Sequence, residues 1–265
     1  MKSMGLGTSN PVYRACIAVV PTLFLGGCAH QVSATTAPAT AAAAPDANPL
    51  QTAYPERAPL DEYMMDRDEE IALAKSSAPP AIANDATVLV MTKTGYETAV
   101  EGKNGFVCLV ERSWTAPFSD PGFWNPKGRA PLCMNPPAVR SALPVNIKRS
   151  ELALAGLSKG AILARMKELI AQKAFPVPEI GSMSYMLSKN QWVSDADKHW
   201  HPHLMFYVPG DMDASVWGAN LPGGSTVYGG GEELPGGGHL PWTIFFVPVP
   251  RWSDGTLFEE HQHTG

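Results

Sequence analysis

The stretch HWHPHLMFYVP (199–209) places His199, His201 and His203 at every second position, directly before an apolar run. In a strand, side chains at alternate positions project from the same face. Two neutral imidazoles spaced in this way can bind one zinc ion. Three such imidazoles would span roughly 13 Å along a strand, so at most two of them could reach one ion. The pattern therefore indicates a candidate zinc site that needs a further ligand from elsewhere in the chain.

That further ligand could be His239, which follows a glycine run, with Glu232 or Glu233 as a carboxylate that serves as base. Together these side chains would suit a metal-dependent hydrolase. Pro202 opposes this interpretation, because proline cannot donate to a strand ladder and is confined to edges or strand starts. If the strand begins only at His203, the two earlier histidines lie in a loop. We favour this second interpretation, in which the histidines are polar residues at the start of a buried strand.

Residues Gly156-Leu157-Ser158-Lys159-Gly160 match the G-x-S-x-G pattern of hydrolase nucleophile elbows, and Asp and His occur downstream in the order that such enzymes use. The motif requires a buried strand immediately before it. Here residues 150–155 (SELALA) are helix formers without a β-branched side chain. We therefore interpret the motif as a joint between two helices with Ser158 as the N-cap of the second, and assign no catalytic residue.

The first 28 residues indicate where the chain is sent. Lys2 and Arg14 precede a short apolar run, CIAVVPTLFLGG, which is typical of a secretory signal peptide and too short for a permanent membrane helix. The run ends in Leu25-Gly26-Gly27-Cys28, which resembles the lipobox of bacterial lipoproteins. The resemblance implies cleavage before Cys28 and attachment of a diacylglycerol to its sulfur, usually followed by acylation of the new amino terminus with a fatty acid such as palmitate. An ordinary signal peptide that ends in Cys is the alternative.

A lipid-anchored protein of the bacterial cell envelope is therefore expected. Ala29, rather than Asp, follows the cysteine, and in enteric bacteria this would favour the periplasmic face of the outer membrane. Removal of the signal peptide takes away two of the 20 basic residues and no acidic one, which leaves 18 basic residues against 25 acidic ones and a net charge of −7. This charge argues against nucleic acid as a partner and against docking flat on an anionic membrane.

Composition divides the rest of the chain. Residues 28–58 are rich in Ala, Thr and Pro with few large aliphatic side chains, so they cannot bury enough surface to offset their ordering entropy, and we expect a disordered tether. Residues 59–255 are predicted to form a single globular domain, followed by a flexible tail at 256–265. The expected partners are the membrane, through the lipid anchor, and an unidentified envelope ligand or protein.

The four cysteines fall into two groups. Cys16 leaves with the signal peptide and Cys28 is the predicted lipid anchor, which leaves Cys108 and Cys133 in an oxidising compartment. Two thiols in such a compartment most often form a disulfide, and a metal site built of Cys alone needs more than two. Closing this loop would stabilise the fold by about 3 kcal/mol in the chain-entropy model.

The elements that must position these residues follow from hydrophobic periodicity and from turn residues. Phe106, Cys108 and Val110 should share one face of a strand, with Cys108 inward. In chain order we predict a helix within 60–80 stopped by Pro79-Pro80, a buried strand at 86–91, a hairpin over 95–114 that turns at Asn104-Gly105, an irregular excursion at 115–146, an amphipathic helix from Gly160 to about Ala174, and strands at 183–187, 203–208, 215–218 and 243–249.

Two further features have open interpretations. The stretch PGGSTVYGGGEELPGGGH (222–239) lacks the Gly-Lys-Ser/Thr end of a phosphate loop and is typical of a mobile surface loop or lid. Seven tryptophans, all beyond residue 113, could line a ligand groove or fill a thin core, and we favour the core.

The sequence thus predicts an α+β fold, loop-rich, with a mostly antiparallel sheet, a few helices and one disulfide. The predicted function is a lipid-anchored envelope protein that acts as a binding or accessory module without a cofactor. The alternative is a zinc-dependent envelope hydrolase that uses the 199–203 histidines and His239.

Overall fold

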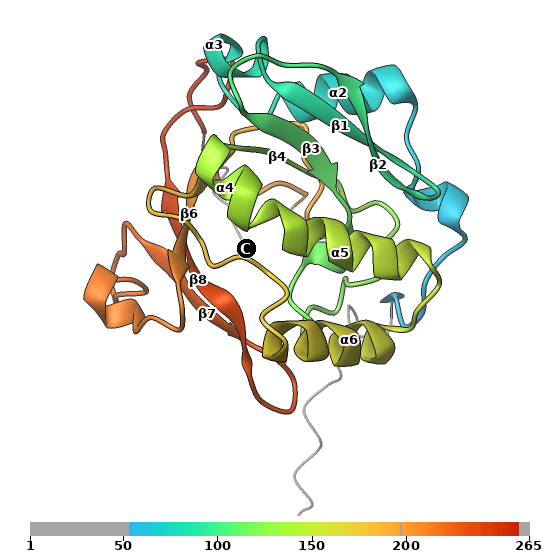
Figure 1. Ribbon diagram of the computed structural model, residues 1–265. Helices are drawn as coiled ribbons and strands as arrows, with labels where there is room; N and C mark the ends of the chain where they lie inside the picture. Colours follow the sequence, from blue (N-terminus) through green and yellow to red (C-terminus); the bar gives the residue numbers. More distant parts are fainter. Residues whose placement is uncertain (1–52, 197, 260–265) are drawn as a thin grey trace, which may run out of the picture. The chain divides into compact units, whose positions relative to one another are not determined.

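The computed structural model describes residues 53–196 and 198–259, so the predicted signal peptide, Cys28 and most of the predicted tether lie outside the described part. In this part the chain forms helices packed against one eight-stranded sheet with the order β2-β1-β3-β4-β5-β6-β8-β7 (Figure 1). Strands β1 and β3 pair in parallel, and the other neighbouring strands of this sheet are antiparallel. The predicted α+β fold with a mostly antiparallel sheet is confirmed.

The strands are β1 (Thr87–Thr92), β2 (Gly95–Val100), β3 (Val107–Glu111), β4 (Ala130–Met134), β5 (Met183–Met186), β6 (His203–Pro209), β7 (Tyr228–Glu233) and β8 (His239–Pro248). The helices are η1 (Leu60–Tyr63), α2 (Arg67–Lys75), α3 (Pro80–Ala83), η2 (Ser113–Thr115), α4 (Pro136–Ser141), α5 (Leu143–Leu154), α6 (Lys159–Ala171) and η3 (Ala214–Trp217). No helix in the described part of the chain combines the length and the apolar character needed to span a bilayer.

One face of the sheet, called the inner face, packs against α5 and α6. Alternate side chains of the strands, such as Leu109 and Leu132, meet Val145 of α5 and Ile162 and Met166 of α6 in one core. The Ser158 hydroxyl accepts a hydrogen bond from the Ala161 N–H at 3.3 Å and caps α6. The predicted joint between two helices is confirmed.

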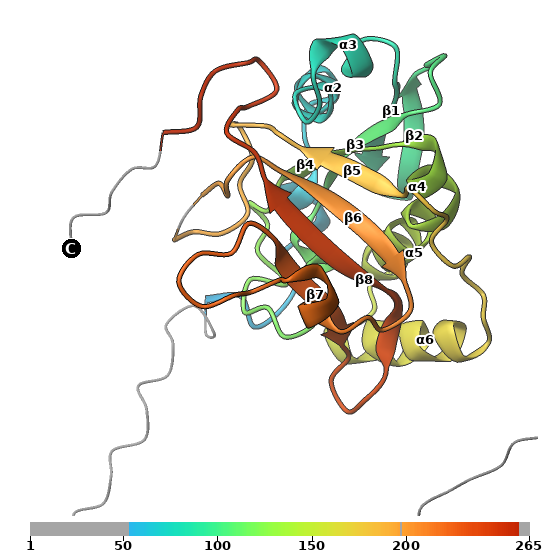
Figure 2. The same ribbon diagram turned by 90° about the vertical axis from the view of Figure 1, so that its left-hand side faces the viewer.

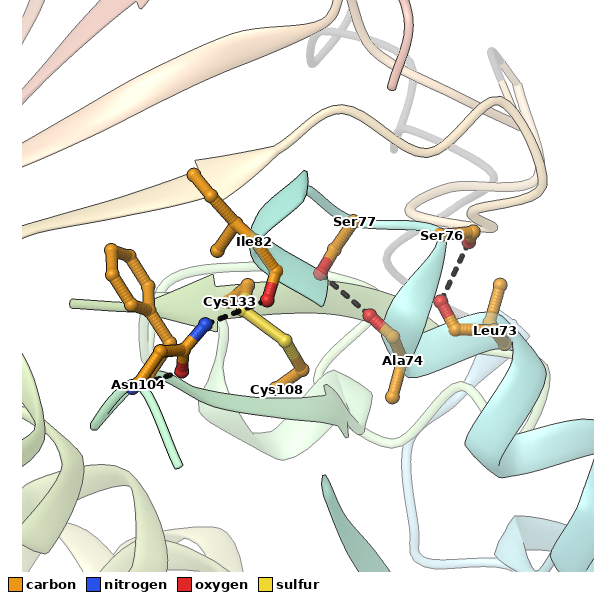
Figure 3. The surroundings of a disulfide bond; sticks show 9 residues. Leu73, Ala74, Ser76, Ser77, Ile82, Asn104, Cys108 and Cys133 are labelled. Carbon is orange, nitrogen blue, oxygen red and sulfur yellow. Dashed lines mark hydrogen bonds between the residues drawn. A yellow bond between two sulfur atoms is a disulfide. The ribbon is translucent and has the colours of Figure 1, made fainter. Parts of the chain in front are cut away.

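The opposite, outer face is covered by α2 and α3, but only over its first strands (Figure 2). Alanines of these helices, including Ala74 and Ala83, pack against Val88, Cys108 and Cys133. The two cysteines lie directly opposite each other on β3 and β4 and form the predicted disulfide, which is fully buried under α2 and α3 (Figure 3). Cys108 was predicted to point into the protein, and its side chain is buried between the sheet and these two helices, so this prediction is confirmed.

A buried ion pair adds to this covered half. The Glu70 carboxylate of α2 and the Arg112 guanidinium after β3 are 2.9 Å apart, and both side chains are fully buried. Glu70 also accepts from the Met91 N–H at 3.1 Å, and the Arg112 Nε donates to the Tyr63 carbonyl at 2.7 Å. The pair therefore connects α2, β1, β3 and η1.

The predicted hairpin over 95–114 is wrong. Strand β2 turns back at Lys93-Thr94 to pair with β1, and β3 pairs with β1 on its other side. Of the predicted turn pair, Gly105 has a positive φ of 77°, whereas Asn104 acts through its side chain, which accepts from the Phe106 N–H and donates to the Ile82 carbonyl (Figure 3). Alternation shows which residues form a strand, but it does not show which strand lies next to it.

Two segments near prolines also differ from prediction. The excursion at 115–146 contains β4, the middle of the sheet, and the short helix α4. Pro80 does not end a helix but begins α3 at its first position, where the missing N–H costs nothing. The single helix predicted within 60–80 is therefore two pieces, η1 and α2, and α3 begins where the predicted helix was to stop.

The C-terminal part corrects two more predictions. Residues 214–217 form η3, begun by an Asp213 side chain that accepts from the Ser215 N–H, and not a strand. A third of the glycine-rich stretch, Tyr228–Glu233, is the edge strand β7, and not part of a loop or lid. A side chain at Gly229 would place its Cβ 2.2 Å from the Ile244 carbonyl oxygen, so glycine lets the two strands approach.

Candidate functional site

The 199–203 histidines do not share one strand face. Strand β6 begins at His203, as the position of Pro202 indicated, and the two earlier histidines precede it. The rings of His199 and His201 pack against Phe258, at centroid distances of 6.5 Å and 4.0 Å. Phe258 belongs to the predicted flexible tail, but its N–H donates to the Pro250 carbonyl at 2.9 Å.

His203 is buried and lies apart from this pair. Its Nδ1 donates to the His201 carbonyl at 2.7 Å, and its ring lies 5.6 Å from Phe246 and 6.0 Å from Trp200. Burial lowers the pKa of the His203 imidazole. The residue is therefore a neutral imidazole at the start of a buried strand.

His239 lies at the other end of the β6–β8 pair. His203 is opposite Pro248 in the register, and His239 is nine residues earlier on β8, roughly 30 Å away along the strand. The His239 imidazole instead lies 3.5 Å from Asp211. No group of three or more His, Cys, Asp or Glu side chains within 53–196 and 198–259 is arranged to hold a metal ion.

The G-x-S-x-G motif has no strand before it, since α5 ends at Leu154, and its serine is the α6 cap. Three of the seven tryptophans fill the inner-face core, whereas Trp200 and Trp217 are exposed. Trp114, Trp124 and Trp242 are at most 4 % exposed and pack in the inner-face core.

A cavity of about 350 Å³ opens between three segments that are far apart in the sequence. They are the first described residues, the loop between η2 and β4, and the start of α6. We call this cavity the Lys159 pocket, and its lining residues are Tyr54, Pro55, Ser119, Asp120, Pro121, Phe123, Trp124 and Lys159.

Lys159 gives the pocket its positive charge. Its ammonium lies 4.9 Å from the centre of the Phe123 ring and donates to the Asp120 carbonyl at 3.3 Å. Partial burial lowers the pKa of this ammonium, and Arg149 adds to the effect while Asp120 opposes it. The pocket thus combines an ammonium, an aromatic wall and the hydroxyl of Ser119.

A second cation lies near the aromatic wall. The Arg149 guanidinium is buried, 4.3 Å from the Phe118 ring centre and 6.0 Å from that of Phe123, and it donates to the Ala116 carbonyl. Its Nε is buried without a hydrogen-bond partner in the described part of the chain. Phe123 therefore lies near two cations, the buried Arg149 and Lys159 in the pocket lining.

Carboxylates on the core side partly balance Arg149. Glu232 accepts from the Phe118 N–H at 3.2 Å, and Glu111 accepts from the Asn146 amide and the Thr115 hydroxyl. Burial raises the pKa of the Glu111 carboxyl to about 7, although these donors and Arg149 oppose the change. Neither carboxylate lines the pocket itself.

The segment that leads in from the predicted tether forms one wall of the pocket. The Tyr54 hydroxyl donates to the Asp195 carboxylate, which also receives the Trp192 indole N–H at 3.2 Å. This bond raises the pKa of Tyr54 to about 12 and lowers that of Asp195. The Arg57 guanidinium donates to the Ala153 carbonyl at 2.7 Å. Residues 53–58, which we predicted as the end of the tether, therefore pack on the folded part.

Sequence reasoning missed Lys159, Arg149 and Asp120 as site residues. The one available signal was the position of Lys159 at the first residue of α6, where a cation is unfavourable for the helix dipole and so is unusual. Comparisons with protein-family models, with curated proteins and with solved structures find no match.

Proposed function

We propose that the protein is a lipid-anchored binding module of the bacterial cell envelope, and that its Lys159 pocket binds a small organic anion with an aromatic or apolar part. The observation that carries this proposal is the ammonium of Lys159 at the wall of a cavity of about 350 Å³, with the Arg149 guanidinium 6.0 Å from the centre of the same Phe123 ring. Ligand pockets of proteins have volumes of about 300–1,000 Å³, so the ligand is small.

The charges of the pocket support an anion. Lys159 and Arg149 both lie near the Phe123 ring, and Asp120 is the one carboxylate among the described lining residues. One oxygen of Asp120 accepts the Gly122 N–H at 2.6 Å, so part of its acceptor capacity is used within its own loop. A ligand carboxylate could form a charge-assisted hydrogen bond with Lys159, which is stronger than a neutral one.

The arrangement supports binding rather than catalysis. The described lining of the pocket contains no histidine or cysteine, and within it no hydrogen bond joins the Ser119 hydroxyl to Lys159 or to the Asp120 carboxylate. The targeting part of the proposal comes from the sequence of residues 1–28, whose lipobox resemblance predicts the anchor at Cys28. A tether of about 25 residues between Cys28 and the described region would span roughly 25–30 Å.

Isothermal titration with benzoate tests the pocket, with benzamide as an uncharged probe of the same shape. The full chain in detergent should bind benzoate and not benzamide. Lys159→Met keeps the methylene stem but removes the charge, and should weaken benzoate binding by about tenfold or more, because a hydrogen bond to a charged group contributes roughly 1.5–3 kcal/mol.

Lys167→Met is the matched control, since Lys167 lies on α6 two turns further along and does not line the pocket. This variant should bind benzoate as the wild type does. Equal affinity of Lys159→Met and wild type for benzoate, or equal affinity of the wild type for both probes, would contradict the proposal. The anchor is tested separately by palmitate labelling, which Cys28→Ala should abolish.

A further inference from the structure

The outer face of the second half of the sheet is apolar, and in the described residues no α-helix covers it. Strands β5, β6 and β8 face the viewer in Figure 2, with α2 and α3 only beyond one end of them. The apolar side chains on this face are half-buried and belong to neither core: Met183, Leu204, Phe206, Val208 and Val247. We call this surface, together with Val216 and Trp217 of η3, the outer apolar face.

Hydrogen bonds fix η3 on this face. The buried Thr243 hydroxyl accepts from the Met212 N–H at 2.7 Å and donates to the Gly210 carbonyl at 2.9 Å, so the loop before η3 is tied to β8. The Trp217 ring stacks on the Phe245 ring at a centroid distance of 4.4 Å and an interplanar angle of 8°. The tryptophan is therefore held in place before any partner arrives.

The held side chains remain accessible. Trp217 is 37 % exposed, the neighbouring Val216 is 71 % exposed, and Leu221 in the following loop is 55 % exposed. A tryptophan that is fixed by its neighbours yet open to solvent is typical of the residues that dominate binding energy at protein interfaces.

The charged side chains on β6, β8 and the segment between them are of one sign. Residues 199–250 contain no Lys or Arg, whereas Asp211 and Asp213 are exposed beside η3. Two copies that met through this face about a two-fold axis would bring these carboxylates together, and an anionic lipid surface would repel them. The face therefore suits a partner with positive charge beside apolar side chains.

We propose that the outer apolar face is a docking site for a segment of another protein in which Lys or Arg side chains lie next to aliphatic or aromatic ones. The apolar side chains of the segment would pack on Trp217, Phe206 and Val216, and its cations would lie against Asp211 and Asp213. The docking site lies on the outer face of the sheet, whereas Phe123 and Trp124 of the Lys159 pocket belong to the inner-face core. The docking proposal does not depend on the function proposed for that pocket.

Fluorescence anisotropy with a labelled peptide of alternating lysine and valine tests the docking site on the full chain in detergent. The peptide should bind, and a peptide with glutamate in place of lysine should not. Trp217→Ala should weaken binding by roughly tenfold or more. Asp211→Asn with Asp213→Asn should weaken it at low salt, and the difference should shrink as salt is raised.

Tyr228→Ala is the matched control, because Tyr228 is 43 % exposed and lies opposite Phe246, on the inner side of the sheet. Trp217→Phe, which keeps an aromatic ring on Phe245, should retain most of the binding and shows that loss in Trp217→Ala is not misfolding. Equal binding of the lysine peptide to Trp217→Ala and wild type would overturn the proposal. A dimer of the wild type that Trp217→Ala dissociates in sedimentation would also overturn it, since a second copy would then be the occupant.

Discussion

The two halves of the sheet are built differently. Strands β1, β3 and β4 are covered on both faces, by α5 on the inner face and by α2 and α3 on the outer face. Strands β6 and β8 pack on the inner-face core, but their outer face carries only η3 and its loop in the described residues. The first half also holds the disulfide and the buried Glu70–Arg112 pair.

The difference indicates that the two halves of the sheet have different roles. In the covered half, Glu70 and Arg112 form a buried ion pair and the disulfide cross-links the chain, so this half contributes rigidity. In the second half, apolar side chains that pack with neither core remain at the surface of a region without basic residues. Apolar surface of this kind marks interaction sites in soluble proteins. The covered half therefore acts as the scaffold that presents the other.

The largest expected effect is a loss of stability in the covered half. Glu70→Ala leaves the Arg112 guanidinium buried without its carboxylate, and removing one partner of a buried pair typically costs about 3–5 kcal/mol. We expect the free energy of unfolding in urea to fall by this amount. Glu97→Ala, which removes the exposed partner of Arg67, should cost less than about 1 kcal/mol. Similar losses in both variants would contradict the scaffold role of the buried pair.

The second prediction uses pH to weaken the same half. The pKa of Glu111 is raised to about 7 in the folded chain, so folding favours its protonated form. Its contribution to stability is therefore complete below the ordinary carboxyl pKa of about 4.5 and is lost as pH rises through 7, a change of roughly 3 kcal/mol. The other ionisable groups that interact with Glu111 in the described residues are Arg149, Tyr96 and Tyr207.

Glu111→Gln removes this titration while it keeps a side chain that can bond Asn146. Urea unfolding at pH 5 and pH 8 should show a larger decrease for the wild type than for the variant, by roughly 2–3 kcal/mol. Glu97→Gln, an exposed carboxylate, should follow the wild type. Parallel pH profiles of Glu111→Gln and wild type would show that the carboxyl does not titrate in this range.

The sequence predicted the features that depend on local patterns and missed those that depend on long-range packing. Local patterns predicted the strand at 86–91, the α6 cap at Ser158 and the inward Cys108, because each depends on neighbouring residues alone. The pairing of β1 with both β2 and β3 was missed, because strand order depends on long-range packing. The disulfide was predicted from compartment and count, and its place on directly opposite residues of β3 and β4 came only from the structure.

The candidate sites show the same limit. The histidine pattern was local and visible, but the register of β6 and β8 places His203 and His239 at opposite ends of the strand pair. The Lys159 pocket joins Tyr54, the 119–124 loop and the start of α6, and no spacing in the sequence relates these segments. The outer apolar face could not be predicted for a similar reason. The apolar pattern of β6 predicts a buried strand whether or not a helix covers its outer side.

The smallest expected effect is a loss of stability in β7 and β8 that leaves the covered half unchanged. Gly229 of β7 has a φ of 115°, and a Cβ there would lie 2.2 Å from the Ile244 carbonyl oxygen of β8. Gly229→Ala should therefore lower stability by about 2 kcal/mol, within the range that strained backbone positions cost. In hydrogen exchange the amides of β7 and β8 should lose protection, whereas those of β3 and β4 should keep it, because the disulfide and both layers of helices hold them.

Gly230→Ala is the matched control, since no atom lies within 4 Å of the Cβ that it would add on the same strand. It should change the exchange of β8 less than Gly229→Ala does. If Gly229→Ala instead deprotected β3 and β4 together with β8, the two halves would unfold as one cooperative unit. The second half would then contribute to the stability of the first. Binding of a partner to the outer apolar face would also change the stability of the covered half and of the Lys159 pocket.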